Sequence, residues 1–149
     1  IKNILLYAEE KGIDPDRIIY SKRYPMNNYL DRLKVADLFL DTFPVTAHTT
    51  ASDALWVGLP VLTLAGKSIV SRVAGSLLTN INMKELITYN YDDYKNMALK
   101  LSNDKKFYND LRSKLQKERL SSPLFNTKQY TKDLESIYNK LYKNFKSSF

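Results

Sequence analysis

A chain of 149 residues is the length of one ordinary domain, and its 44% hydrophobic content is enough for a core, which excludes disorder for most of it. The chain has no cysteine and one histidine, which excludes disulfides, thiolate catalysis, Cys-based zinc sites and multi-histidine metal sites. It contains no run of about 18 apolar residues and no basic-then-apolar N-terminus, so we expect neither a membrane span nor a secretory signal on it.

The net charge of +7 raises the question of a nucleic-acid partner. The excess lies after Lys95, in helical patterns that also carry acids every few residues, and no base-stacking aromatic motif accompanies it. We therefore expect a solvated face, and no nucleic-acid or membrane partner. The lack of cysteine permits a cytoplasmic or nuclear location, which we expect. Because the chain begins at Ile1 without a methionine and already within a helical pattern, we expect it to be a piece of a longer protein.

The first half of the chain alternates helical and strand patterns. Helical spacing over residues 3 to 11 ends at Gly12, and the β-branched run Arg17-Ile18-Ile19-Tyr20 predicts a buried strand. Residues 26 to 34 return to helical spacing. Residues 36 to 41 predict a second strand, which ends before Pro44 because proline cannot continue it.

The next helix is predicted to begin near Thr49 and to end at Gly58 and Pro60, before a strand over residues 61 to 64. Short apolar strands that alternate with helices are typical of an α/β fold with a parallel, doubly wound sheet. In such sheets ligands bind beyond the carboxyl ends of the strands, which are here residues 21 to 25, 42 to 48 and 65 to 71.

The remainder of the chain is predicted to be mostly helical. Helices are expected over residues 68 to 79, 91 to 101, 104 to 119 and 127 to 146, with one short strand over residues 85 to 88. The last helix carries an apolar stripe that must pack on this sheet or on a missing domain. We therefore divide the chain into a core over residues 1–90, incomplete at its N-terminus, and a C-terminal helical segment over residues 91–149 that packs on it.

The segment from His48 to Asp53 is the best candidate site. Thr49 and Thr50 lie where the free N–H groups of a helix point, at the carboxyl side of a strand, and such a terminus favours a phosphate. Alternatively, Thr49 is a plain N-cap and His48 a surface residue. Asp53, one turn later, could hold a ribose hydroxyl or could compensate the helix dipole.

A second candidate lies at the next strand end. Gly66-Lys67-Ser68 is not a P-loop, because Val61 stands where that motif requires glycine. Lys67, Ser68 and Arg72 could still face an anion, or they could simply begin a helix, and Arg32 has the same ambiguity.

Four separated motifs resemble the O-GlcNAc transferase family, glycosyltransferase family 41, and the resemblance covers the chain from about Gly12 to Tyr142. The motifs are residues 36 to 42, the His48-Thr49-Thr50-x-x-Asp53-x-Leu55-Trp56-x-Gly58-x-Pro60 segment, Ser71-Arg72-Val73-Ala74, and residues 119 to 131, which read RLSSPLFNTKQYT.

The resemblance implies half of a GT-B fold, a Rossmann-like parallel sheet followed by C-terminal helices, and the half that binds UDP. His48, Thr49 and Thr50 would lie against the diphosphate and Asp53 would bind the ribose. The base would be approached by Arg32, by Tyr24 and Pro25, and by Tyr29. The family commonly has lysine and histidine around the uracil, where this chain has Met26 and Tyr29.

Members of the family transfer N-acetylglucosamine from UDP-GlcNAc to Ser or Thr with inversion and without a metal or other cofactor. The acceptor half, its upstream TPR repeats and a diphosphate-binding lysine would precede Ile1, so we expect this chain alone to be inactive. Two alternatives stay open. They are a transferase for another sugar or acceptor, such as asparagine glucosylation, and a nucleotide-binding module without turnover.

Overall fold

The computed structural model describes residues 1–147, apart from the side chain of Asn27. Its sheet has the order β1-β2-β3, with β1 at Phe39–Leu40, β2 at Val61–Leu64 and β3 at Ile87–Thr88. All pairs are parallel, in a register that sets Phe39 opposite Val61 and Thr63 opposite Ile87. The predicted α/β class with a parallel sheet is therefore confirmed.

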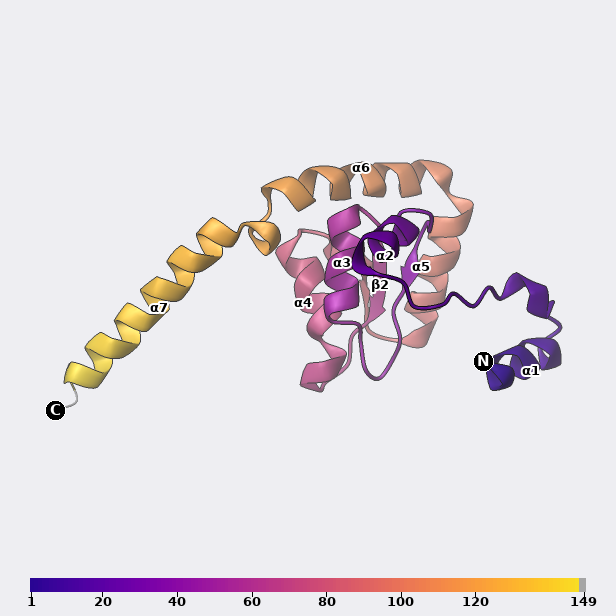
Figure 1. The fold of residues 1–149 in the computed structure, drawn as a ribbon, viewed down its shortest axis with the longest axis horizontal. Coiled ribbons are helices and arrows are strands. Elements are labelled where there is room, and N and C mark those ends of the chain that lie inside the picture. The colour runs from indigo at the N-terminus through magenta and orange to yellow at the C-terminus, as the bar shows by residue number, and fades with distance from the viewer. Residues whose placement is uncertain (148–149) are drawn as a thin grey trace.

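Helices surround this sheet, and several end where local sequence signals require (Figure 1). Gly58 ends α3 (Thr49–Val57) in the left-handed conformation, at φ 85°, which residues with a Cβ rarely adopt. Asn90 caps α5 (Tyr91–Asn103) and Asp104 caps α6 (Lys105–Ser121), because their side chains accept bonds from the N–H groups of Asp93 and Phe107. The helices are α1 (Lys2–Glu10), α2 (Met26–Leu33), α3 (Thr49–Val57), α4 (Val73–Asn80), α5 (Tyr91–Asn103), α6 (Lys105–Ser121) and α7 (Thr127–Ser147).

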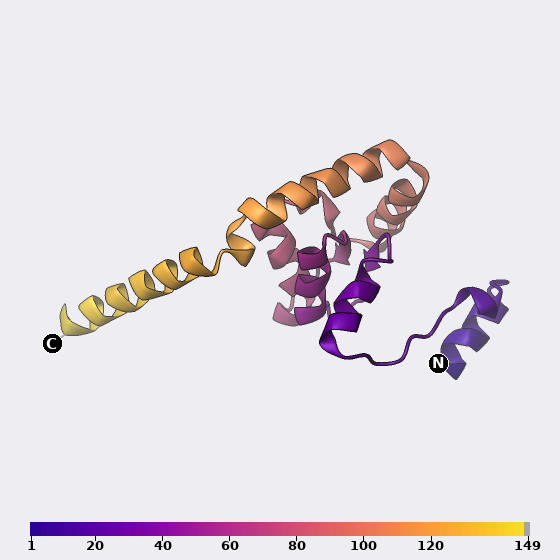
Figure 2. The same cartoon turned by 45° about the horizontal axis from the view of Figure 1, so that its top comes forward.

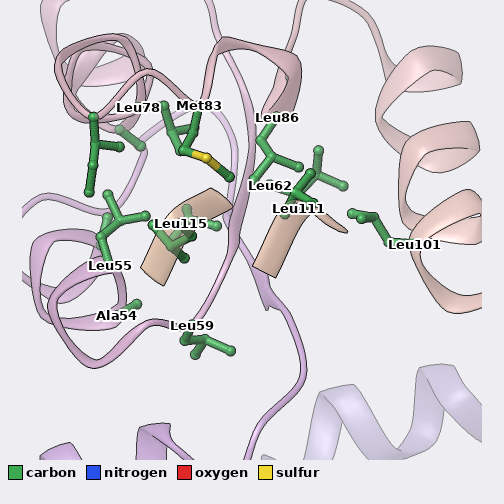
Figure 3. Packing of buried hydrophobic residues seen from close by; sticks show 14 residues of the cluster. Ala54, Leu55, Leu59, Leu62, Leu78, Met83, Leu86, Leu101, Leu111 and Leu115 are labelled. Atoms are coloured by element: carbon green, nitrogen blue, oxygen red, sulfur yellow. The ribbon is translucent and has the colours of Figure 1, made fainter. Parts of the chain in front are cut away.

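The core lies between β2 and the helices that contact it, α3, α4 and α5, and it is closed by α6 (Figure 3). Leu55, Leu62, Leu78 and Leu115 are fully buried in it. Burying a side chain of this kind stabilises a fold by about 1.5–3 kcal/mol. All four residues of β2 are buried, so the central strand is held by packing on both faces. The loops that follow the strands therefore start from fixed positions.

The strand predicted at residues 17–20 is wrong. Arg17 ends a 3-10 turn at Pro15–Arg17, and the segment that follows runs without regular structure to α2. Ile19 is 89% exposed and Tyr20 is 68% exposed. A strand requires a neighbour to pair with its N–H and C=O groups, and in the described part of the chain none lies beside this segment. With α1, the segment projects from the body (Figures 1 and 2).

Three further elements are shorter than predicted. The strand expected over residues 36–41 is reduced to β1 at Phe39–Leu40. The helix expected over residues 68–79 is a 3-10 turn at Ile69–Ser71, followed by α4. The Ser71 hydroxyl donates to the Ser68 carbonyl oxygen and the Gly66 N–H donates to that of Ser71, so a closed turn precedes the helix. The strand expected over residues 85–88 shortens to β3, because Lys84–Leu86 form a 3-10 turn.

The C-terminal helices differ in how they pack. Leu101 of α5 and Leu111 and Leu115 of α6 belong to the core cluster. Helix α7 extends away from the body and contacts the 3-10 turn at Pro123–Phe125 (Figure 1). Ile137 and Leu141 of its apolar stripe are 52% and 60% exposed. Among residues 1–147, the stripe is therefore not covered by the sheet.

Candidate functional site

The N-terminus of α3 is open to solvent. His48 is the residue before the helix, and its carbonyl oxygen accepts the N–H of Ser52 at 3.1 Å, but its side chain makes no capping bond. Thr49 is the first residue of the helix rather than its cap, and His48, Thr49 and Thr50 are all exposed. The first N–H groups of α3 thus have no side-chain cap, and such a helix terminus favours an anion.

Asp41 shapes the loop that leads to this terminus. Its carboxylate is buried, and one oxygen accepts the N–H groups of Thr42 at 2.9 Å and Ala47 at 2.7 Å. The other oxygen accepts the Thr63 hydroxyl of β2 at 2.7 Å. Asp41 therefore joins both ends of the 42–47 loop to the central strand and fixes the residue that precedes His48.

Tyr94 of α5 also binds the start of this loop. Its hydroxyl donates to the Asp41 carbonyl oxygen at 2.9 Å. Burial raises the pKa of Tyr94 and the nearby Asp41 carboxylate adds to the effect, so the phenol keeps the proton that it donates.

The base-recognition candidates lie on α2 and on the segment just before it, and α2 packs on α3. The Arg32 guanidinium carbon lies 5.4 Å from the ring centroid of Tyr24 and 5.6 Å from that of Tyr29, within cation–π range. Arg32 also donates to the Ser21 hydroxyl and, at 2.8 Å, to the Lys22 carbonyl oxygen. Burial raises the pKa of Tyr29, the charge of the Asp53 carboxylate on α3 and a hydrogen bond to that carboxylate raise it further, and Arg32 opposes these effects.

The predicted UDP-binding residues lie at the start of α3 and on or just before α2, and these two helices pack on each other. Asp53 lies on α3 one turn after the open terminus at His48, Thr49 and Thr50, and its carboxylate interacts with Tyr29. Tyr29 and Tyr24 in turn both lie within cation–π range of Arg32.

The second candidate site, which consists of Lys67, Ser68 and Arg72, lies elsewhere. The Ser68 hydroxyl donates to that of Ser71 at 3.0 Å, and Lys67 is exposed. Arg72 lines an open cavity of about 730 Å³ bounded by α4 and the ends of β2 and β3, not by α2 or α3. Thr46 joins the two strand-end loops, because its N–H and hydroxyl both donate to the Val70 carbonyl oxygen, at 3.0 and 2.8 Å.

The profile of Glycosyl transferase family 41 matches residues 1–134, which is most of the chain. The chain belongs to glycosyltransferase family 41. The resemblance seen in the motifs is thereby confirmed. Among curated relatives, the chain is 35% identical over 146 residues to the UDP-N-acetylglucosamine–peptide N-acetylglucosaminyltransferase of Caenorhabditis elegans, covering 98% of this chain and 13% of that protein.

A second relative is the probable UDP-N-acetylglucosamine–peptide N-acetylglucosaminyltransferase SEC of Arabidopsis thaliana, 34% identical over 91% of this chain and 14% of its own length. The fold is similar to a mutant O-GlcNAc transferase of Thermobaculum terrenum, with a TM-score of 0.88 and 28% identity over 96% of this chain and 28% of that one. This likeness confirms the predicted Rossmann-like part of a GT-B fold. The chain thus spans about one seventh of these curated relatives.

The sequence did not point to four residues that hold the loops of the candidate site in shape, namely Asp41, Thr46, Thr63 and Tyr94. An acid directly after an apolar strand was a usable signal for Asp41, and a hydroxyl within the run Val61–Leu64 was one for Thr63. No local pattern could have pointed to Tyr94, which lies 53 residues after its partner.

Residues 1–147 contain neither a metal-binding cluster nor a membrane-spanning helix. No group of three His, Cys, Asp or Glu residues lies there in an arrangement that could hold a metal ion. No helix in that range is both long and apolar enough to cross a membrane.

Proposed function

We propose that this family 41 chain is the UDP-sugar-binding C-terminal part of a protein O-GlcNAc transferase. The intact protein would transfer N-acetylglucosamine from UDP-GlcNAc to Ser or Thr hydroxyls with inversion. The observation that carries the proposal is the open N-terminus of α3, with His48, Thr49 and Thr50, directly beside the cluster of Asp53, Tyr29 and Arg32.

The diphosphate would lie at the N-terminus of α3. Its negative charge would be stabilised by the free N–H groups, the hydroxyls of Thr49 and Thr50, and the His48 side chain. The same donors would stabilise the charge that develops on UDP as it leaves, which is the part of the reaction that this chain can assist. Because these donors can stabilise the charge of a diphosphate, we propose that no metal or other cofactor takes part.

The nucleoside would extend from α3 toward α2. Asp53 would accept bonds from the ribose hydroxyls, and Arg32, Tyr24 and Tyr29 would surround the base. Lys67, Ser68 and Arg72 are proposed only as a secondary anion contact, because Ser68 is already bonded to Ser71 and Arg72 lies on the separate α4 cavity.

The protein acceptor would bind parts of the intact protein outside this chain. For that reason we propose that the chain alone is inactive, that its partners are a UDP-sugar and protein acceptors rather than nucleic acid or a membrane, and that it acts in the cytoplasm or nucleus. The relatives it matches carry names of peptide glycosyltransferases, which supports a protein acceptor.

Met26 and Tyr29 favour one alternative function. Met26 is 63% exposed at the start of α2 and brings no charge to a position where the family commonly has lysine. A weakened or altered base site would fit a nucleotide-binding module without turnover.

A donor assay on the full-length protein separates these functions. We expect kcat/KM for UDP-GlcNAc to exceed that for UDP-glucose by about tenfold or more on a Ser/Thr peptide, because a pocket built for the acetamido group loses its bonds with glucose. A matched peptide with alanine at the acceptor positions is the control. Glucose transfer to an asparagine peptide would instead identify a transferase that glucosylates asparagine. UDP binding without turnover of any donor would identify the binding module.

A further inference from the structure

The cavity beside α4 contains a single charged side chain. The cavity has a volume of about 730 Å³, and among the described residues that line it only Arg72 carries a charge. Neither of the two ion pairs within residues 1–147 and none of the hydrogen bonds there involves this guanidinium. A guanidinium offers five N–H donors in a planar fork that matches a carboxylate or a phosphate. The cavity is therefore suited to an anionic group.

The backbone of Arg72 is held on both sides. Its N–H donates to the Ile69 carbonyl oxygen at 3.0 Å, and its carbonyl oxygen accepts the Ser76 N–H at 2.9 Å. The turn before it is closed by the Ser71 hydroxyl, which donates to the Ser68 carbonyl oxygen at 2.9 Å. The guanidinium thus lines the cavity from a fixed backbone position, which lowers the cost of ordering it when a ligand binds.

Exposed apolar side chains adjoin this cation. Ile69 is 85% exposed and Tyr89 is 74% exposed, and both line the same cavity as Arg72. A free phosphate would leave these two side chains uncovered. A polypeptide can bind the guanidinium with one acidic side chain and cover the apolar groups with the residues beside it. The lining therefore favours an acidic polypeptide segment over a small anion.

The cavity lies close to the N-terminus of α3, because Thr46 joins the two loops. The N–H and the hydroxyl of Thr46 donate to the Val70 carbonyl oxygen at 3.0 and 2.8 Å. His48 follows Thr46 by two residues, and Arg72 follows Val70 by two residues. Since two residues of extended chain span at most about 7 Å, the backbones of His48 and Arg72 lie within about 20 Å of each other. About six residues of an extended polypeptide span that distance.

We propose that Arg72 is a specificity-determining residue for the protein acceptor. It binds the carboxylate of an Asp or Glu that lies within about six residues of the modified Ser or Thr. Ile69 and Tyr89 contact the apolar residues beside that acid. The inference rests on the proposed transfer to a protein acceptor at the N-terminus of α3, and it gives Arg72 an anion other than the UDP diphosphate.

The experiment measures kcat/KM of the full-length protein for acceptor peptides at saturating UDP-GlcNAc. The peptides share one serine and carry a single Glu, which is moved one position at a time through about six residues on either side of it. The matched peptide has alanine in place of Glu. At the position that reaches Arg72, Glu should raise kcat/KM about fivefold over alanine, as expected for a charge pair partly exposed to water. Arg72→Gln should make the two peptides equal, and Arg72→Glu should favour a peptide with lysine there.

Lys140→Gln is the matched control, because it also removes one positive charge but lies on α7, which extends away from the body (Figure 1). It should leave the preference for Glu unchanged. A preference that survives Arg72→Gln, or no preference at any position in the parent, would overturn the inference. A melting temperature lowered by several degrees in Arg72→Gln would overturn it too, since the guanidinium would then be bound by another part of the intact protein. A parent that modifies none of the peptides would instead overturn the proposed function.

Discussion

Replacing Asp41 with alanine is expected to lower the free energy of unfolding by about 3 kcal/mol. The substitution removes the acceptor of three hydrogen bonds, from Thr42 N–H, Ala47 N–H and the Thr63 hydroxyl. The Thr63 side chain is fully buried, so its hydroxyl cannot turn to bulk water. Chemical denaturation followed by circular dichroism measures the change.

Asp41→Asn is the matched control. An asparagine carbonyl oxygen can accept both N–H groups, and its amide can donate to the Thr63 hydroxyl, so the loss should be about 1 kcal/mol. Equal stability of the alanine variant and the parent would show that Asp41 does not hold the 42–47 loop. We also expect Asp41→Ala to weaken UDP binding in whatever fraction remains folded, because that loop ends at His48.

Replacing His48 and Thr50 together with alanine is expected to weaken UDP binding by about 100-fold. Each side chain would contribute one bond to the charged diphosphate, worth about 1.5 kcal/mol or more, and tenfold in affinity corresponds to about 1.4 kcal/mol. Both residues are exposed, so the unfolding transition should move little. Calorimetry of the full-length protein with UDP measures the affinity.

Uridine is the matched ligand for this experiment. It lacks the diphosphate, so its weaker binding should be the same in the parent and in the double variant. Thr50→Ser, which keeps the hydroxyl, should retain most of the UDP affinity. A double variant that loses uridine and UDP binding to the same extent would contradict a role in diphosphate recognition.

Much of the central fold follows from local sequence signals. Gly58 and Pro60 mark the end of α3, and the apolar run that follows is β2, as predicted. Residues 17–20 show the limit of this reasoning, because the apolar run there is intrinsically suited to a strand but has no neighbour within the described chain. Strand formation depends on pairing across the sheet, which a local pattern does not contain.

The candidate site likewise has residues that the sequence reveals and contacts that it does not. His48, Thr49, Thr50 and Asp53 could be found from sequence because they lie within one helical turn and match one motif. The proximity of Tyr29 to Asp53 depends on how α2 packs on α3, and the bond from Tyr94 to Asp41 depends on where α5 lies. Such contacts are set by tertiary packing.

The central claim is that a UDP-sugar binds at the N-terminus of α3. Its most direct test is a titration of the isotope-labelled chain with UDP, followed by amide resonances. We predict shifts concentrated at His48, Thr49 and Thr50 and extending to Asp53 and α2, and their loss when His48 and Thr50 are both replaced with alanine. No shift at millimolar UDP, or shifts confined to residues 67–72, would contradict the claim.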